Sequence, residues 1–279
     1  MNTIHFHKYQ ATGNDFVLID NRAGKYSFTK DQIAKVCDRR FGVGADGLLL
    51  IEKHPSFDFN LVYYNSDGSQ SLCGNGSRAA VMMASSLGML NGKTIFNAYD
   101  GSHEAEVLPN GIIRLKMNNV KAVKMMGEDI FINTGSPHFI RFVKKLEGYP
   151  VLEEGRKIRY SEAYSPHGAN ANFVELQNDN SIFVRTYERG VEDETLSCGT
   201  GVTAAALAAS LKGYRSPVVV KVLGGELSVE FKTGELNALA EQAGIKAEIN
   251  NPSATNTGIF HDIFLIGPAK MVFEGDLEL

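Results

Sequence analysis

A short glycine-rich segment occurs twice in this sequence, and each copy opens an apolar stretch. The first copy reads Cys73-Gly-Asn-Gly-Ser-Arg-Ala-Ala, and the second reads Cys198-Gly-Thr-Gly-Val-Thr-Ala-Ala. A strand-like segment and a polar loop precede each copy, with the strands expected over 57–64 and 181–187. Repetition in the same order predicts two duplicated halves, with a boundary near residues 118–122.

A weaker match lies upstream of each copy. Gly13–Leu18 reads GNDFVL, and Asn170–Leu176 reads NANFVEL. We interpret these two segments as equivalent positions of the two halves.

The spacing of apolar residues predicts many short strands and a few helices. Thr29 can cap a helix over Lys30–Arg39, and Pro137 suits the first turn of a helix over Ser136–Glu147. The other expected helices cover Gly74–Leu87, Gly199–Lys212 and residues around Gly234–Gly244. Further strands are expected over Ile4–Tyr9, Phe16–Asp20, Leu48–Ile51, Ile112–Met117, Val218–Leu223 and Ile263–Ile266. Strands outnumber helices without a sustained βαβ rhythm, which predicts an α+β protein.

Composition is that of an ordinary globular protein. Apolar residues make up 43% and charged residues 22%, and the net charge of −4 gives no basic footprint for nucleic acid. The apolar stretches around Ala79–Leu90 and Ala204–Leu211 are too short to span a membrane, and no signal peptide is visible. We therefore expect a cytoplasmic protein with no nucleic-acid or membrane partner. The histidines lack HxxxH and HExxH spacing and the cysteines lack CxxC spacing, so no metal site is expected.

A cysteine followed by Gly-X-Gly at a helix start has a specific chemical meaning. The unpaired N–H groups of the first turn and the helix dipole stabilise a thiolate there, and they can also bind a carboxylate. One thiolate could remove the Cα proton of an amino acid while the other cysteine, as a thiol, protonates the opposite face. Either segment alone could instead hold a buried structural cysteine, but duplication favours the functional interpretation. Cys37 lies on the apolar face of the helix expected over 30–39 and is predicted to be core.

Several motifs together resemble the diaminopimelate epimerase family. They are GNDF at Gly13–Phe16, GVGADG at Gly42–Gly47, NSDGSQSLCGNGSR at Asn65–Arg78, TGSPHF at Thr134–Phe139, ERG at Glu188–Gly190 and CGTG at Cys198–Gly201. The resemblance covers most of the chain. Three features depart from the family pattern: Ser136 replaces an asparagine, Gly47 replaces a glutamine of some members, and the loop from Asn65 to Cys73 is shorter.

The resemblance implies two similar domains related by a pseudo-two-fold, each a strand-rich barrel around a central helix. Residues 1–118 plus about 266–279 would form the domain that carries Cys73, and residues 119–265 would form the domain that carries Cys198. The implied enzyme is an isomerase of lysine and peptidoglycan-precursor biosynthesis. It would interconvert LL-2,6-diaminopimelate and meso-2,6-diaminopimelate as a homodimer, without pyridoxal phosphate, another cofactor or a metal.

The resemblance also implies the site residues. Cys73 and Cys198 would be catalytic, and His138 and Glu188 would support them. The substrate-binding residues would be Asn14, Asn65, Gly74, Asn75, Asn170, Glu188, Arg189, Gly199 and Thr200. The planar fork of Arg189 suits a distal carboxylate, and Glu188 suits a distal ammonium group.

Two alternatives stay open. A proline racemase or hydroxyproline epimerase would share the fold and the CGTG segment, although such enzymes tend to carry a histidine where this chain has Asn75. A ligand-binding thiol redox switch, a protein of another class, would need Cys73 and Cys198 joined in a disulfide.

Overall fold

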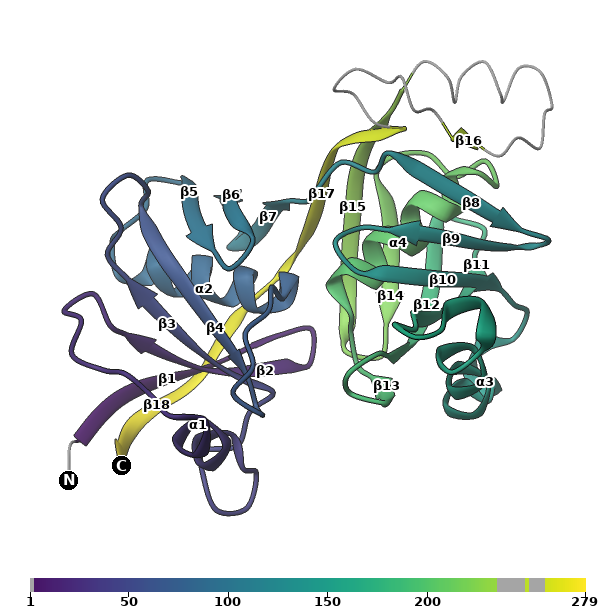
Figure 1. Cartoon of the computed structure of the whole chain (residues 1–279). Coiled ribbons are helices and arrows are strands. Elements are labelled where there is room, and N and C mark those ends of the chain that lie inside the picture. Colours follow the sequence, from purple (N-terminus) through teal and green to yellow (C-terminus); the bar gives the residue numbers. More distant parts are fainter. Residues whose placement is uncertain (1–2, 235–248, 251–258) are drawn as a thin grey trace. The chain divides into compact units, whose positions relative to one another are not determined.

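The computed structural model describes residues 3–234, 249–250 and 259–279. The chain divides into two compact units, one made of Met1–Leu115 with Gly267–Leu279 and the other of Lys116–Ile266. Within each unit, strands surround one long helix (Figure 1). The helix expected around Gly234–Gly244 lies outside the described residues, apart from Gly234 itself. Among the described residues, every helix is too short or too polar to cross a membrane.

The first unit is an α+β unit with eight strands in one continuous order. The strands are β1 (Thr3–Ala11), β2 (Asn14–Asp20), β3 (Gly47–Glu52), β4 (Phe59–Asn65), β5 (Lys93–Ala98), β6 (Gly101–Val107), β7 (Ile112–Lys116) and β18 (Lys270–Glu278). They pair in the order β18-β1-β2-β3-β4-β5-β6-β7, and only β2–β3 and β4–β5 are parallel. Helix α1 (Lys30–Cys37) connects the first parallel pair, and α2 (Gly74–Ser86) connects the second.

The second unit repeats this topology. Its main strands are β8 (Ala122–Met126), β9 (Asp129–Asn133), β10 (Pro137–Phe142), β11 (Asn170–Leu176), β12 (Ser181–Glu188), β14 (Val218–Val222), β15 (Gly225–Thr233) and β17 (Phe260–Pro268). They pair in the order β8-β9-β10-β11-β12-β14-β15-β17, and only β10–β11 and β12–β14 are parallel. The short strands β13 (Asp193–Thr195) and β16 (Ile249–Asn250) add to β12 and β8.

The helices of the second unit occupy equivalent connections. Helix α3 (Val151–Arg159), flanked by the single turns η1 (Leu146–Gly148) and η2 (Glu162–Tyr164), connects the first parallel pair, and α4 (Gly199–Ser210) connects the second. Strand for strand and helix for helix, the two units therefore share one topology. This shared topology is the structural counterpart of the repeated glycine-rich segments.

The central helix of each unit is buried because strands surround it. Helix α2 packs on β1, β2, β3, β4, β6 and β18, and α4 packs on β9, β10, β11, β12, β14 and β15. Apart from Thr200, every residue of α4 is buried, which explains why this helix is apolar around its whole circumference. The helices predicted over Gly74–Leu87 and Gly199–Lys212 are confirmed to within two residues.

Helix α1 begins where the sequence predicts, with a capping box between Thr29 and Gln32. It ends at Cys37, before the predicted end, because the Asp38 carboxylate accepts hydrogen bonds from the backbone N–H groups of residues 40 and 41, both at 2.7 Å. Cys37 is only 4% exposed and belongs to the core between α1 and β3. The prediction that Cys37 is a core residue is confirmed.

The helix predicted over Ser136–Glu147 is wrong. Half of this segment forms β10, which pairs with β9 on one side and β11 on the other. Pro137 suits a helix start, but it is equally tolerated as the first residue of a strand. The aromatic and β-branched residues that follow it decide for the strand.

Helix α3 was not predicted because a glycine interrupts it. A Cβ atom on Gly155 would lie 2.3 Å from the Tyr187 side chain, so the glycine permits close packing on β12. The glycine lowers the helix propensity of this segment, and packing of the helix on β12 stabilises it nonetheless.

The proposed equivalence of Gly13–Leu18 and Asn170–Leu176 is also wrong. The first segment lies in β2, whose topological counterpart is β10, whereas the second lies in β11, the counterpart of β3. Both strands of each parallel pair are buried and apolar. A segment of β2 can therefore resemble a segment of β11, although β10 is the counterpart of β2.

Candidate active site

Cys73 is the N-cap residue of α2. Its Sγ atom accepts a hydrogen bond from the backbone N–H of Gly76 at 3.5 Å. Gly74 and Asn75 follow as the first residues of the helix, and both are buried. A thiol at this point lies at the positive end of the helix dipole, which favours a thiolate and an anionic ligand.

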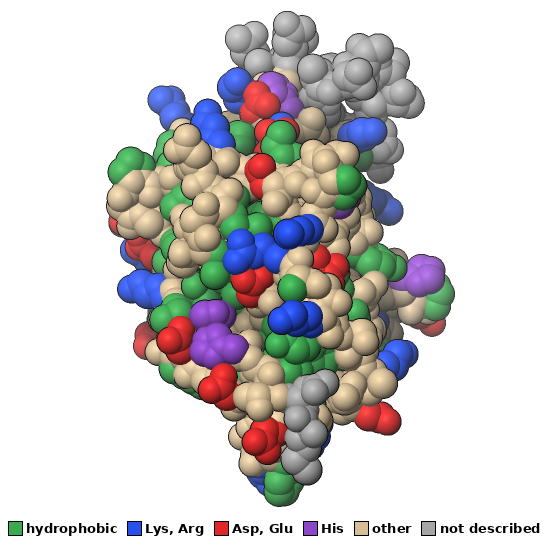
Figure 2. All heavy atoms as spheres, turned by 90° about the vertical axis from the view of Figure 1, so that its left-hand side faces the viewer, with side chains coloured by type: hydrophobic (Ala, Val, Ile, Leu, Met, Phe, Trp, Pro, Cys, Tyr) green, Lys and Arg blue, Asp and Glu red, His purple; other side chains and the backbone are tan. Residues whose placement is uncertain are grey.

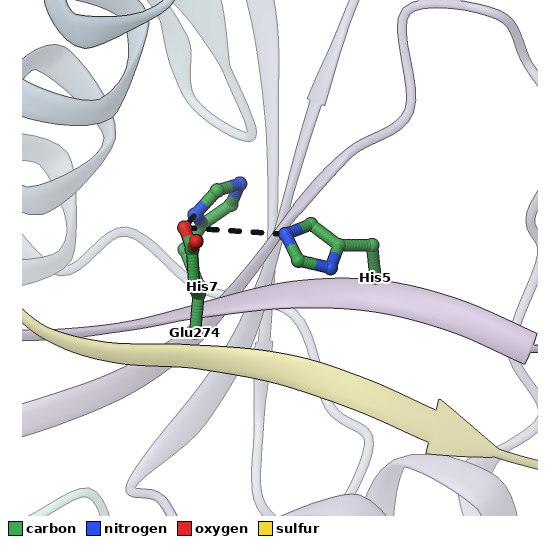
Figure 3. Close-up of side chains that lie close together, drawn as sticks. All are labelled: His5, His7 and Glu274. Atoms are coloured by element: carbon green, nitrogen blue, oxygen red, sulfur yellow. Dashed lines mark ion pairs between the residues drawn. The ribbon is translucent and has the colours of Figure 1, made fainter.

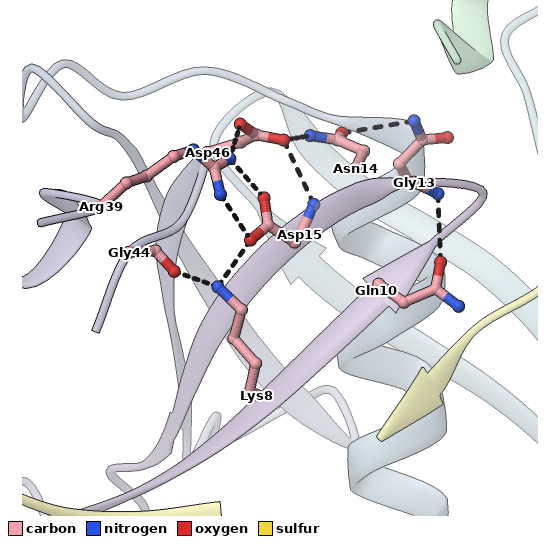
Figure 4. A network of polar contacts seen from close by, with 9 residues as sticks. Lys8, Gln10, Gly13, Asn14, Asp15, Arg39, Gly44 and Asp46 are labelled. Atoms are coloured by element: carbon pink, nitrogen blue, oxygen red, sulfur yellow. Dashed lines mark hydrogen bonds and ion pairs between the residues drawn. The ribbon is translucent and has the colours of Figure 1, made fainter. Parts of the chain in front are cut away.

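The Asn14 side chain lies between the Cys73 thiol and the Asp46 carboxylate. Its Nδ2 donates to the Asp46 carboxylate (Figure 4), while its Oδ1 lies 3.3 Å from Asn75 Nδ2 and 3.5 Å from Cys73 Sγ. Since a carboxylate only accepts hydrogen bonds, Asp46 fixes the amide nitrogen on its own side and directs the amide oxygen to the thiol. The structure thus brings Asn14, Cys73 and Asn75 together, and it adds Asp46, for which no role was predicted.

Asp46 belongs to a network of ion pairs (Figure 4). Arg39 bridges Asp46 and Asp15 with N–O distances of 2.7 Å to each, and Lys8 Nζ lies 2.6 Å from Asp15. Burial alone would raise the pKa of Asp15, but hydrogen bonds from Arg39 and Lys8 outweigh it and lower this pKa to about 2. Asp15 therefore stays ionised and holds Arg39 in place beside Asp46.

Asn65 ends β4 directly opposite Gly47 of β3. Its Nδ2 donates to Ser69 Oγ at 2.9 Å and to Ser71 Oγ at 3.2 Å, so it orders the loop that leads to Cys73. A side chain at Gly47 does not fit this backbone, because its Cβ would lie 2.6 Å from the backbone oxygen of Tyr64. Packing thus accounts for the glycine where some family members carry a glutamine.

Arg78 is a fully buried cation near the Cys73 thiol. Its Nη2 donates to Thr12 Oγ1 at 3.3 Å, but Nε and Nη1 have no hydrogen-bond partner in the part of the chain that the structure describes. Burial lowers the pKa of Arg78 to about 10, and the interaction with Cys73 opposes this effect. The positive charge therefore favours the thiolate form of Cys73. Arg78 belongs to the motif Asn65–Arg78, but the sequence alone did not predict this role for it.

Cys198 is the N-cap residue of α4, the place equivalent to that of Cys73. It is 6% exposed, and its Sγ lies 3.6 Å from Thr200 Oγ1. Gly201 cannot carry a side chain here, because a Cβ would lie 2.4 Å from Asn172 Oδ1 and 3.3 Å from Cys198 Sγ. The glycine allows a polar side chain to approach the first turn of the helix. Gly199 and Thr200 open this turn as the sequence predicts.

A chain of hydrogen bonds leads from Thr186 to Thr200. Thr186 Oγ1 donates to Asn172 Oδ1 at 3.0 Å, and Asn172 Nδ2 donates to a backbone carbonyl at 3.0 Å and lies 3.1 Å from His138 Nδ1. His138 Nδ1 is therefore an acceptor, and Nε2 carries the proton that it donates to Thr200 Oγ1 at 2.9 Å. The Thr200 hydroxyl can then donate to Cys198 Sγ. Asn172 has this role although the sequence did not predict it.

His138 is fully buried on β10 and neutral. Burial lowers its pKa, the positive charge of Arg189 lowers it further, and the hydrogen bond with Asn172 only partly opposes them, so the pKa is about 3. The imidazole therefore does not titrate near pH 7 and acts by orienting Thr200.

Asn170 connects β11 to the segment after β12. Its Oδ1 accepts from the backbone N–H of Arg189 at 2.8 Å, and its Nδ2 donates to the backbone oxygen of Pro137 at 3.1 Å. The guanidinium of Arg189 donates to the backbone oxygen of His167 at 3.3 Å. Asn170 thus fixes the backbone of Arg189, and the Arg189 side chain extends from that fixed point.

Glu188 ends β12, and its carboxylate accepts a hydrogen bond from Thr195 Oγ1 at 3.0 Å. Glu192, a possible partner for Arg189, pairs instead with Arg159 at 3.0 Å. Glu188 and Arg189 are thus adjacent in the chain and opposite in charge. The Glu188 side chain contacts Thr195, and the Arg189 side chain contacts the backbone of His167.

Equivalent strands supply the polar groups of the two units. Asn14 at the start of β2 contacts Cys73, and His138 near the start of β10 reaches Cys198 through Thr200. Asn65 ends β4, and Glu188 ends the equivalent strand β12. Each unit therefore offers a thiol at a helix N-terminus, surrounded by groups that donate or accept hydrogen bonds. Such a half-site can bind a carboxylate and move one proton.

Solved structures share this fold at low sequence identity. A PhzF-family phenazine biosynthesis protein from Bacillus anthracis matches with a TM-score of 0.72 and 15% identity, covering 100% of both chains. A hydroxyproline epimerase from Agrobacterium vitis, solved with bound trans-4-OH-L-proline, matches with a TM-score of 0.67 and 12% identity, covering 99% of this chain and 93% of that chain. The fold is therefore one that amino-acid epimerases and PhzF-family proteins share.

Among the proteins that share this fold, sequence comparison assigns the chain to one family. The profile of diaminopimelate epimerase matches residues 6–128 and 130–244. A diaminopimelate epimerase from Flavobacterium psychrophilum is 46% identical over 274 residues, covering 96% of this chain and 98% of the relative. Another from Aquifex aeolicus is 43% identical over 298 residues, covering 99% and 98%. This chain belongs to the diaminopimelate epimerase family.

Proposed function

We propose that this chain interconverts LL-2,6-diaminopimelate and meso-2,6-diaminopimelate, with no pyridoxal phosphate, metal or other cofactor. The observation that carries the proposal is the equivalent position of two cysteines, each the N-cap of a central helix, in a member of this family. On this proposal each unit is an epimerase domain that contributes one thiol.

Cys73 and Cys198 are the proposed acid and base. One thiolate takes the proton from Cα, so a C–H bond breaks, an S–H bond forms, and the electron pair spreads onto the α-carboxylate. The other thiol then gives its proton to the opposite face of Cα and becomes a thiolate. The two sulfur atoms exchange protonation states in each turnover, so the reaction runs in both directions. The mechanism requires both thiols to reach one Cα.

The groups around each thiol have supporting roles. Backbone N–H groups of Gly74, Asn75, Gly199 and Thr200 are proposed to stabilise negative charge on the α-carboxylate, since they begin α2 and α4. Asn14 and the neutral His138 are proposed to orient the groups next to the sulfur atoms. Both side chains are neutral, so their charge does not change during the reaction.

Glu188 and Arg189 are proposed to bind the distal amino-acid head. Arg189 can pair with the distal carboxylate through two N–H groups, and Glu188 can accept from the distal ammonium group. Asn65 and Asn170 are proposed to complete this binding. A substrate without the second head forms none of these contacts, so it gains no binding energy from them and is selected against.

We also propose that the enzyme acts in the cytoplasm, as a homodimer, on the route to lysine and peptidoglycan precursors. Met271, Val272 and Phe273 on β18 support self-association, because these large apolar side chains are 46% to 57% exposed. Sedimentation velocity should show a dimer that Val272→Lys weakens. A wild-type monomer at micromolar concentration would contradict this part of the proposal.

The direct test is incubation of the reduced protein with LL-diaminopimelate and no added cofactor, followed by chiral chromatography. We expect meso-diaminopimelate to accumulate and L-proline, incubated in parallel, to stay unchanged. Equal turnover of L-proline would favour a proline racemase. All three cysteines, each within the described residues, are thiols rather than disulfides. A redox-switch protein would instead show ligand binding only after oxidation joins Cys73 to Cys198.

A further inference from the structure

His5, His7 and Glu274 bring three ligand atoms together on the first unit, apart from both cysteines in the sequence (Figure 3). In the antiparallel pair of β1 and β18, His7 lies opposite Glu274 and His5 lies opposite Asp276. Residues two apart on a strand point to the same face. The register of the sheet therefore places two imidazoles and two carboxylates on one face.

The Glu274 carboxylate lies between the two imidazoles (Figure 3). Its Oε2 atom lies 3.3 Å from His7 Nδ1 and 4.0 Å from His5 Nε2, and the three ligand atoms lie within 4.8 Å of one another. Ligands of a tetrahedral zinc ion, bound at about 2.0–2.2 Å, are roughly 3.3 Å apart. The distance between Glu274 Oε2 and His7 Nδ1 already has this value. The His5 side chain is 52% exposed, so it can rotate by the small amount needed to bring its Nε2 closer to Glu274.

Asp276 prepares His5 for coordination. His5 Nδ1 lies 3.0 Å from Asp276 Oδ1, and a carboxylate only accepts, so Nδ1 carries the proton. The lone pair of Nε2 then points toward Glu274. A carboxylate behind a histidine is the usual outer partner of a zinc ligand, because it fixes the tautomer and the ring orientation. Two histidine side chains lie side by side among acidic side chains on the face that Figure 2 shows.

We propose that His5 Nε2, His7 Nδ1 and Glu274 bind a divalent cation of the zinc class, with Asp276 as the outer partner of His5. Two imidazoles and one carboxylate favour Zn²⁺ over Mg²⁺, which prefers oxygen ligands. The ion would join β1 to β18, the first and last described strands of the chain, and so stabilise the fold. The sequence did not reveal this site because His-x-His follows the two-residue period of a strand rather than the helical spacing HxxxH.

The test is a zinc titration of the untagged, full-length protein against a fluorescent zinc chelator. We expect one site per chain in wild type, an affinity at least tenfold lower in His5→Gln, His7→Gln and Glu274→Gln, and a loss of 10- to 100-fold in Asp276→Asn. His261→Gln is the matched control, because His261 also lies beside a carboxylate, Asp262, at 3.4 Å. Mg²⁺ should not compete. Saturating Zn²⁺ should raise the melting temperature of wild type but not of His7→Gln.

Thiols also bind zinc, so the titration is repeated on the Cys73→Ser/Cys198→Ser variant. We expect the site to persist there. Zinc binding that disappears in the cysteine variant but survives in His5→Gln and His7→Gln would overturn the proposal, as would the absence of a saturable site in wild type.

Discussion

His138 Nε2 lies 2.9 Å from Thr200 Oγ1, and Thr200 Oγ1 lies 3.6 Å from Cys198 Sγ. Because the neutral imidazole donates its proton to the hydroxyl, the hydroxyl proton can be directed to sulfur. Cys73 has a different neighbour, since the amide oxygen of Asn14 is an acceptor. The two thiols therefore differ in their side-chain neighbours: a hydroxyl that can donate lies next to Cys198, and an amide oxygen that accepts lies next to Cys73.

Removing the Thr200 hydroxyl should slow the reaction. We expect Thr200→Val to lower kcat by about 10- to 100-fold, because Cys198 loses a hydrogen-bond donor. Thr200→Ser keeps the hydroxyl and is the matched control. Steady-state rates with both stereoisomers check this, and equal rates for the Val and Ser variants would refute a role for the hydroxyl.

Buried His138 should make the protein less stable in acid. Its pKa is about 3 in the folded protein against an ordinary value of 6.5, so between these values the unfolded state binds one more proton. The free energy of unfolding therefore rises with pH in this window, by up to about 1.4 kcal/mol per pH unit. Urea unfolding of wild type and His138→Gln from pH 4 to pH 8 measures the difference. Parallel pH curves for the two proteins would show that His138 does not carry this effect.

The three cysteines should respond differently to substitution. We expect Cys73→Ala and Cys198→Ala each to lower kcat by at least about 10²-fold, because each removes one of the two proton-transfer groups. Cys37→Ala should keep most activity. Burial raises the pKa of Cys37 to about 11, so that thiol is unreactive near pH 7. Circular dichroism confirms folding, and full activity in either of the first two variants would exclude the two-thiol mechanism.

Arg78 should matter for reactivity more than for stability. Arg78→Met replaces an incompletely paired buried cation with an apolar chain of similar length, so the free energy of unfolding should stay the same or rise. Without the positive charge, alkylation of Cys73 by iodoacetamide at pH 7 should slow, and kcat should fall about tenfold or more. Cys198 alkylation, followed by mass spectrometry, is the internal control. An unchanged alkylation rate at Cys73 would argue that Arg78 has only a packing role.

The two cysteine half-sites were predictable because their signal is local. A cysteine before Gly-X-Gly and an apolar run defines a helix N-terminus without reference to any distant residue, and α2 and α4 begin where this pattern places them. The strands that carry apolar runs, such as β3, were also found. Their two buried faces leave a continuous signal in the sequence.

The residues that the sequence missed act through tertiary contacts. Asp46 and Asn172 contact site residues that lie about thirty positions away in the chain, and no local pattern marks such pairs. His138 was placed on a helix because Pro137 fits both a helix start and a strand start. Pairing with β9 and β11, which no local signal encodes, decides between them.

The central claim is that two thiols act on opposite faces of one Cα, and turnover of LL-diaminopimelate in D₂O tests it most directly. The thiol that delivers the proton exchanges with solvent beforehand, so the first meso product should carry deuterium at the inverted carbon. The remaining LL substrate should carry much less at early times. Mass spectrometry of the isomers, separated at low conversion, measures both. A first product that keeps mostly protium at the inverted carbon would contradict the two-thiol account, because a single group would then be returning the proton that it removed.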